Sequence, residues 1–374
     1  MAKSLHLSRE VKVYVEFDGK FWEIPVLDGY SFSQGTNITE VTVAEMADAT
    51  NNSRRGRYAF TDSVAPAEFS FSTYARPFVA DSDHHAVEEV LWALFAGAAN
   101  YDATEASGNI FDNGDTSPIT VINSDTTDLS LTFTGSNKLT FADMNVWFKL
   151  TASGDNSADD LWYKLTGAVL SEASIDFDID GIATINWSGM AKTLTEPDTA
   201  PTLGTLASTS SAIESTGNFI RNRLTQLSLT PETAINEGTA YSNLVLTGGN
   251  ISISNNPTFV TPESLGVVNT PLAHVMGTRS VTGSFTCYLN NDANSSAELI
   301  SDLLGATTTV TNSFNMALDI GGATAPKVQV NIPRAHLEIP STTIEDVISV
   351  EVNFHGLPSD INSADEMSIN YFGA

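Results

Sequence analysis

The sequence predicts a mainly β protein made of two tandem copies of one β-rich unit, each with a single helix. Three observations predict it: apolar and polar residues alternate in many short segments, helical periodicity occurs in only two places, and landmarks of the first half recur in order in the second. With 374 residues, the chain has room for two ordinary domains. Apolar residues make up 41% of it and charged residues 17%, so it can bury a core and is not disordered throughout.

Alternation identifies the strands. Breaks at Gly19 and Gly181 separate pairs of alternating segments, which predicts two hairpins. A further strand is expected at the core of a long polar stretch, at residues 129–134. The alternating segments of the first half are residues 11–17, 21–27, 68–74, 174–180 and 182–187.

Two segments have the 3.6-residue spacing of a helix, and each ends at a glycine. The first covers residues 85–96, with Asp83 as the expected N-cap. Its apolar stripe leaves Glu88 and Glu89 on the solvent side, so we do not expect them to act as a catalytic carboxylate pair across a cleft. The second covers residues 296–304.

The second half repeats the first. Residues 28–42 align with residues 248–262 without a gap, at an offset of 220 (248 minus 28). Four further landmarks follow in the same order, which indicates a tandem duplication. They are residues 71–74 with 285–288, the helix ending at Gly97 with the one ending at Gly305, residues 173–176 with 335–338, and residues 186–189 with 353–356.

Composition predicts where the units begin and end. The first unit is expected to span residues 1–192, including an insertion at 98–137 that has no counterpart in the second half. A linker rich in Pro, Ser and Thr, residues 193–216, leads to the second unit, residues 217–374. A long polar loop is expected at residues 44–66.

The charge balance excludes several classes of function. Lys and Arg number 17 against 45 Asp and Glu, for a net charge of −28. Nucleic-acid affinity depends on cations that displace counterions from phosphates, so tight DNA or RNA binding is close to excluded and binding to an anionic membrane is disfavoured. The N-terminus lacks an apolar signal core, so we expect synthesis in a cytoplasm. The only cysteine, Cys287, excludes an internal disulfide and is expected to be a small core residue.

Two clusters resemble metal sites, but other interpretations are favoured. Residues 176–181 match the opening of a calcium loop, D-x-D-x-D-G, but Trp187 stands where a bidentate Glu is needed. An amphipathic strand is favoured, with its carboxylates outward and Phe177 and Ile179 inward. The adjacent histidines at 84–85 point apart and are expected near a helix start. Because common catalytic motifs are also absent, we predict no catalytic site, no metal site and no cofactor.

One basic cluster stands out on this acidic chain: Arg54, Arg55 and Arg57. It suits docking onto another acidic copy of the chain. A solvated loop explains the cluster equally well, so both interpretations stay open.

Several segments resemble the tail tube proteins, or major tail proteins, of long, non-contractile-tailed phages of the T-five-like group. The longest is RGRYAFTDSVAPAEFSFSTY at residues 55–74. Shorter ones follow in order at residues 186–189, 246–249, 260–262, 282–290 and 357–360. The likeness extends from about residue 10 to 365, and it agrees with the duplication because these subunits are similar to two fused tube domains.

The resemblance implies two tandem tail-tube domains, each a β-sandwich or half-barrel with one flanking helix. Three chains are then expected to close a trimeric, pseudo-hexameric ring, and rings to stack into the hollow conduit for DNA ejection. Partners would be the chain itself, the tape measure protein and tail-tip or terminator proteins, in the virion and with no membrane. The loop at residues 44–66, with its three arginines, and its counterpart at 262–280 are expected to reach the next ring.

The acidic charge fits such a conduit. A wall lined with cations would hold DNA at every ring, whereas a like-charged wall leaves the duplex hydrated and free to slide. We therefore expect carboxylates of the alternating strands to face the lumen. The candidates are Asp176, Asp178, Asp180, Glu338 and Glu351.

Alternative functions remain open at this point. A carbohydrate-binding or adhesin module suits a β-rich chain with many Asn, Thr and Ser residues, but it would need exposed aromatic platforms. All five tryptophans lie in apolar or alternating contexts and are expected to be buried. A hub or terminator, which forms a ring without polymerising, is another alternative. A hydrolase has only the number of carboxylates in its favour.

Overall fold

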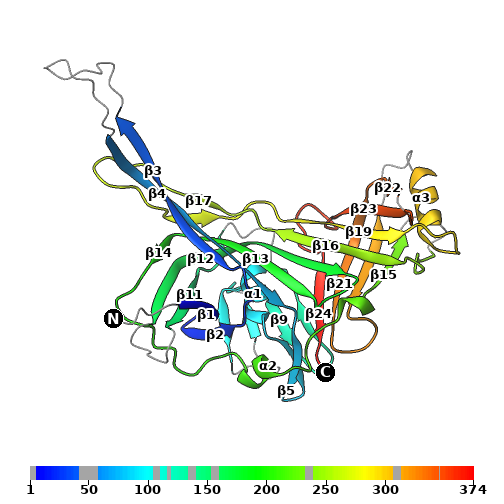
Figure 1. Cartoon of the computed structure of the whole chain (residues 1–374), viewed down its shortest axis with the longest axis horizontal. Coiled ribbons are helices and arrows are strands. Elements are labelled where there is room, and N and C mark those ends of the chain that lie inside the picture. Colours follow the sequence, from blue (N-terminus) through cyan, green and yellow to red (C-terminus); the bar gives the residue numbers. More distant parts are fainter. Residues whose placement is uncertain are drawn as a thin grey trace.

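The computed structural model describes residues 6–41, 58–103, 110–115, 119–133, 140–152, 160–231, 239–305, 313–344 and 346–374. Strands dominate these residues and the ladders that join them are antiparallel, which confirms the predicted mainly β class. Figure 1 shows an elongated molecule from which the hairpin of β3 (Ser31–Val41) and β4 (Tyr58–Tyr74) projects at one end. None of the described helices is long and apolar enough to cross a membrane.

The first half contributes β1 (His6–Phe17), β2 (Lys20–Ile24), β11 (Met144–Ala152), β12 (Leu161–Asp178), β13 (Thr184–Ala191) and β14 (Thr193–Thr195). With β3 and β4, they form a ladder in the order β1-β11-β12-β13-β4-β3. Both predicted hairpins are confirmed, β1 with β2 and β12 with β13. Gly19 and Gly181 have positive φ in the two turns, a conformation that glycine adopts without steric penalty.

The second half contributes β15 (Gln226–Pro231), β16 (Leu246–Ser254), β19 (Ser280–Tyr288), β20 (Phe314–Ile320), β21 (Lys327–Leu337), β22 (Ser341–Thr343) and β23 (Ser349–Gly356). Their ladder runs β15-β20-β21-β23-β19-β16, which is the order of the first half repeated strand for strand. A helix follows the equivalent strand in each half, α1 (Glu89–Phe95) after β4 and α3 (Ser296–Gly305) after β19.

The ladders correct the register of the repeat. Gly189 pairs with Phe69, which pairs with Phe32; at the equivalent place Gly356 pairs with Val281, which pairs with Ile253. The offset between β3 and β16 is therefore 221 (253 minus 32), not 220. Because side chains alternate along a strand, the offset of 220 would equate an inward position with an outward one.

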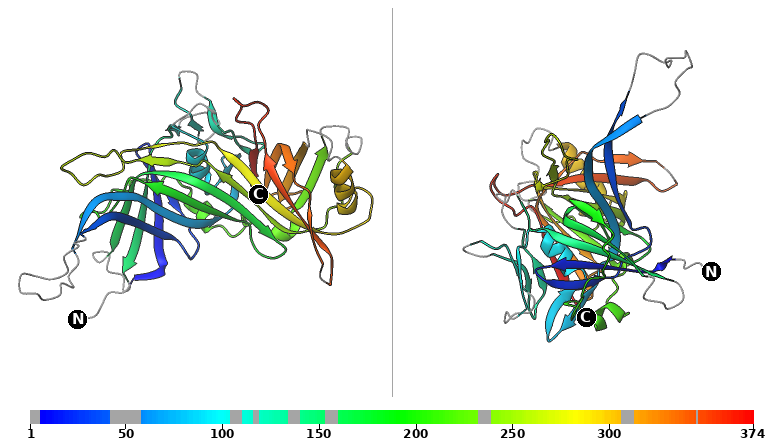
Figure 2. Two further views of the ribbon diagram at one scale, coloured as in Figure 1. Left: turned by 90° about the horizontal axis from the view of Figure 1, so that it is seen from above. Right: turned by 90° about the vertical axis from the view of Figure 1, so that its left-hand side faces the viewer.

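The two halves are joined edge to edge. The C-terminal part of β12 pairs with β13 on one side and with β16 on the other, placing Ala173 opposite Ile253 and Ser174 opposite Ser252. One continuous sheet, β3-β4-β13-β12-β16-β19-β23, therefore crosses both halves (Figure 2).

The insertion of the first half builds onto the second half. It forms β7 (Asn100–Asp102), β8 (Ile110–Asp112), β9 (Thr120–Ser124) and β10 (Leu129–Leu131). The last of these pairs with the C-terminal strand β24 (Ser368–Phe372), which in turn pairs with β21. The insertion and the end of the chain thus hold the two halves together a second time.

Helix α1 is shorter and more deeply buried than its sequence indicates. The segment expected as its first turn is instead β6 (Asp83–Ala86), which pairs with β5 (Pro77–Ala80), so Asp83 is no N-cap. Glu88 and Glu89, expected on the solvent side, are buried with 1% and 5% exposure. The cause is tertiary, because α1 is enclosed between β12 and β9 and buries every side chain around it.

Aromatic residues fill the core. Trp22, Trp92, Trp147 and Trp187 are buried as predicted, whereas Trp162 is partly exposed. Cys287 is fully buried, and burial raises the pKa of its thiol to about 11, so it is the inert core residue expected. The remaining elements are α2 (Ser210–Glu214), the 3-10 helix η2 (Asn222–Leu224), β17 (Thr258–Val260) and β18 (Ala273–Val275).

Candidate assembly surfaces

The continuous sheet has one buried face and one polar face. Its inward side chains come from both halves and include Phe71, Ile175, Trp187, Ile251 and Phe354. The outward side chains, here named the polar face, include no Lys or Arg. They include Ser70, Ser72, Glu172, Ser174, Asp176, Asp178, Asn186, Ser188, Asn250, Ser252, Ser254, Thr282, Ser284, Thr286, Glu351, Asn353 and His355.

The structure brings the five predicted acidic residues to this face or its margin, and all five are exposed. Asp178 and Glu351 lie in one cross-strand row, with Gly248 and Thr286 between them. Asp176 lies in the adjacent cross-strand row, in which Asn250, Ser284 and Asn353 follow on the neighbouring strands.

The other two acidic residues lie where strands end. Glu338 follows β21, and its carboxylate accepts a hydrogen bond from Asn353 Nδ2 (3.1 Å) and lies 3.1 Å from His355 Nε2. The hydrogen bond with His355, followed by that from Asn353, lowers the pKa of Glu338. Asp180 lies in the turn after β12, 3.6 Å from Arg223 Nη1.

The calcium interpretation is not supported at this strand. Asp176 and Asp178 are separated by the buried Phe177, so they extend from a pleated strand, and Asn186 Nδ2 donates to Asp176 at 2.5 Å. Ile179, expected inward, is 44% exposed because β12 ends at Asp178. Within the described ranges, no group of three or more His, Cys, Asp or Glu side chains is arranged to hold a metal ion.

The projecting hairpin of β3 and β4, here named the arm, carries exposed apolar side chains. Ile38, Val41, Tyr58 and Phe60 are 45–63% exposed, and the two aromatic rings meet edge to face at 4.9 Å. Residues 58–66, expected as part of a polar loop, belong to β4 because they pair with β3. The predicted stacking residues Arg54, Arg55 and Arg57 lie outside the described residues, between β3 and β4 in the sequence.

A second apolar segment lies beside the arm. The loop between β17 and β18, residues 261–272, contacts β4 through hydrogen bonds from Val64 N to Asn269 O (2.8 Å) and from Asn269 N to Asp62 O (3.1 Å). Figure 1 shows this loop running along the arm. Its exposed apolar residues are Leu265, Val267, Val268 and Leu272.

His274 anchors this loop to the first half. The backbone N–H of Phe141 donates to its Nε2 (3.1 Å), and its Nδ1 lies 3.4 Å from Asp143, which also binds Lys192 Nζ at 2.5 Å. The hydrogen bond with His274, and then that with Lys192, lowers the pKa of Asp143. The sequence does not indicate this cluster, since its members are far apart along the chain.

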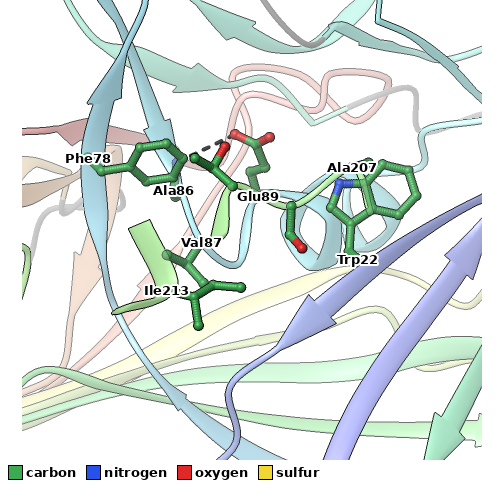
Figure 3. A pocket seen from close by; sticks show the side chains of 9 residues that line it. Trp22, Phe78, Ala86, Val87, Glu89, Ala207 and Ile213 are labelled. Carbon is green, nitrogen blue, oxygen red and sulfur yellow. Dashed lines mark hydrogen bonds between the residues drawn. The ribbon is translucent and has the colours of Figure 1, made fainter. Parts of the chain in front are cut away.

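The buried acids of α1 serve the fold. Glu89 accepts from His85 Nδ1 (3.1 Å) and from the backbone of Ala86 (3.4 Å), which ties β6 to the helix. Figure 3 shows Glu89 beside a cavity that Trp22 and Phe78 also line. Its volume of about 10 Å³ is the size of one water molecule, too small for a substrate.

Comparison with known proteins identifies the family of this chain. Residues 47–356 match the family model for phage tail tube proteins. The tail tube protein pb6 of Escherichia phage T5 is 30% identical over 97% of this chain and 75% of its own length. The match extends across both halves, the insertion and the arm. The chain therefore belongs to the phage tail tube protein family, whose members are structural components of the viral tail.

Proposed function

We propose that this protein is the repeating subunit of a hollow tube in which rings of three chains stack to form the conduit for DNA ejection. The observation that carries the proposal is the joint between β12 and β16. Two equivalent units already pair edge to edge within one chain, so the same joint between chains extends the sheet around a closed ring.

The repeat predicts where the joint between chains lies. Leu337 faces Phe354 as Ala173 faces Trp187, the equivalent of Phe354. The ladders thus make Leu337 the counterpart of Ala173, two residues beyond the Ala335 of the sequence alignment, and β21 with β22 takes the place of β12. Phe32 takes the place of Ile253, so β3 of the next chain takes the place of β16. We therefore expect Phe32 of one chain opposite Leu337 of its neighbour, and Ser31 opposite Glu338.

The position of these edges favours a ring. Among the ladders between described strands, β3 pairs only with β4, and β22, which follows β21, pairs only with β23, so each of these two strands has an open side. The two edges lie toward opposite ends of the long axis (Figure 1), so they cannot meet within one chain. A head-to-tail contact that closes on itself produces a ring and removes exposed strand edges, which otherwise promote aggregation.

The width of the ring follows from strand geometry. Six units with four strands each, as in β3-β4-β13-β12, make a barrel of 24 strands. At about 4.8 Å between strands and a tilt of about 40°, the backbone diameter is roughly 48 Å.

We propose that the polar face lines this barrel, with Asp176, Asp178, Asp180, Glu338 and Glu351 toward the lumen. The opposite face supports this orientation because it packs on the core. A lumen without cations on its strands would not trap phosphates by counterion release.

Stacking is proposed to use the arm and the loop at 261–272. Both project from the body and expose apolar side chains, which mark contact surfaces when they are contiguous. Arg54, Arg55 and Arg57, which lie between β3 and β4 in the sequence, would meet the acidic surface of the next ring.

The proposed units keep their predicted bounds, residues 1–192, a linker at 193–216 and residues 217–374. We further propose that the chain is made in the host cytoplasm and contacts the tape measure protein inside the tube and terminator or tip proteins at its ends.

The test is a double-cysteine experiment with electron microscopy. Ser31→Cys with Glu338→Cys is expected to give covalent trimers on mild oxidation, with hollow tubes visible by negative stain. The matched control is Ser174→Cys with Ser252→Cys, the internal joint, which should crosslink within one chain. Closed single rings would point to a hub or terminator. A chain that stays monomeric at high concentration and binds glycans would refute the tube and support the adhesin.

A further inference from the structure

The turn between β12 and β13 is covered by the start of the second half. Ala183 N donates to Ile220 O (3.0 Å), Asn222 N donates to Gly181 O (3.2 Å), and Ile182 bridges Arg221. Ala183 and Ile220 are completely buried as a result.

The equivalent turn of the second half lacks such a cover within the described chain. Between β22 and β23, Ile344 is 81% exposed, Val347 56% and Ile348 38%. This apolar turn lies at the end of the molecule opposite the arm (Figure 1), next to the edge proposed to join the neighbouring chain.

The ladders identify the segment that corresponds to the cover. Met316 on β20 and Val146 on β11 each follow a bulge at the same place in their ladders, so these two residues are equivalent. Leu229 pairs with Met316 and Val15 pairs with Val146, so β15 and β1 are related by an offset of 214 (229 minus 15). Residues 220–223 therefore correspond to residues 6–9. In β1, Leu7 is half exposed and Arg9 is exposed, so both are accessible for a contact.

We propose that residues 6–9 of one chain cover the β22–β23 turn of its neighbour in the ring. The inference rests on the proposed function. The partner is a second copy of the chain, because the same contact already occurs inside one chain: the start of the second half covers the β12–β13 turn of the first half. Because Gly189 and Gly356 are equivalent, Ile182 corresponds to Ser349, each seven residues before its glycine. Ile182 bridges Arg221, and the offset of 214 makes Leu7 the counterpart of Arg221. Leu7 is therefore expected opposite Ser349.

Charge supports the same placement. In the internal contact, Arg223 lies 3.6 Å from Asp180 of the covered turn. By the offset of 214, Arg9 is the counterpart of Arg223. The uncovered turn between β22 and β23 carries Asp346, which is exposed. The pair Arg9–Asp346 would thus reproduce between chains the ion pair that the two halves form within one chain.

The experiment uses the full chain with Leu7→Cys and Ser349→Cys, oxidised under assembly conditions. Covalent trimers are expected, while the internal counterpart, Ile182→Cys with Arg221→Cys, should crosslink within one chain. The inference is overturned if this pair stays reduced in rings that the Ser31–Glu338 cysteine pair does crosslink. If neither pair crosslinks and no ring forms, the proposed function fails and the inference fails with it.

A charge exchange gives an independent readout without cysteines. Arg9→Asp should raise the concentration needed for assembly by roughly two- to fivefold per contact, the effect of one exposed ion pair. Adding Asp346→Arg should restore it. An Arg9→Asp variant that assembles like the unchanged protein, or one that the second substitution does not rescue, contradicts the pairing.

Discussion

Glu88 should make the stability of the unassembled chain fall between mildly acidic and neutral pH. Its carboxyl group is 1% exposed and accepts hydrogen bonds from the backbone of Arg76 (3.2 and 3.3 Å) and from Tyr371 on β24. Trp92 Nε1 in turn donates to Tyr371 Oη at 2.6 Å. Burial nevertheless outweighs these contacts and raises the pKa of Glu88 from 4.5 to about 7.

The sign follows from proton binding. The folded state holds this proton more tightly than the unfolded state, so the free energy of unfolding is largest below the ordinary pKa and decreases as pH rises to about 7. At about 1.4 kcal/mol per pKa unit, the decrease is about 3 kcal/mol. Glu88→Gln keeps the shape and stays neutral, so it should match the unchanged protein near pH 4 and exceed its stability by about 3 kcal/mol at pH 8.

The assay is urea unfolding at several pH values, comparing Glu88→Gln with the unchanged protein. Glu68→Gln, the same substitution at an exposed position on β4, is the matched control for the exchange of side chain. A difference for Glu88→Gln that is constant from pH 4 to pH 8 would refute the argument, because it would mean that the folded state does not retain the proton.

Further predictions concern packing and the lumen. A Cβ at Gly283 would lie 2.2 Å from Asn250 O, so Gly283→Ala should destabilise the chain by several kcal/mol, whereas Gly35→Ala, with no atom nearer than 3.9 Å, should be nearly neutral in urea unfolding. Trp187→Phe should cost about 1–3 kcal/mol in the same assay, because it leaves a buried hydroxyl, Thr73 Oγ1, without its indole donor at 3.0 Å. Asp178→Lys should permit assembly but give tubes that retain duplex DNA in a salt-dependent way, measured with labelled DNA; equal retention by unchanged tubes would count against an acidic lumen.

Much of the fold follows from local patterns. Alternation identified the strands around Gly19 and Gly181, because two-residue periodicity is an intrinsic property of a half-buried strand. Helical spacing found α3, which ends at Gly305 as expected. The ordered landmarks indicated the tail tube family before any pairing was known, and the family match agrees with them.

The candidate site was predictable only in part. The alternating carboxylates of β12 were identified as outward-facing, and they are exposed on the polar face. That Asp178 and Glu351 share a row depends on three ladders between strands far apart in the sequence, which no local pattern contains. The anchoring of the loop at residues 261–272 by His274 and Asp143 is non-local in the same way.

By itself, the sequence determined many of the strands, that one unit occurs twice, and which family the chain resembles, since each of these depends on residue order alone. Only the tertiary structure decided which edges meet. The pairing of β12 with β16, the insertion of β24 between β10 and β21, and the burial of Glu88 all depend on contacts between distant segments. The physical reason is that periodicity specifies which face of a strand is apolar, while strand partners are selected by packing in three dimensions.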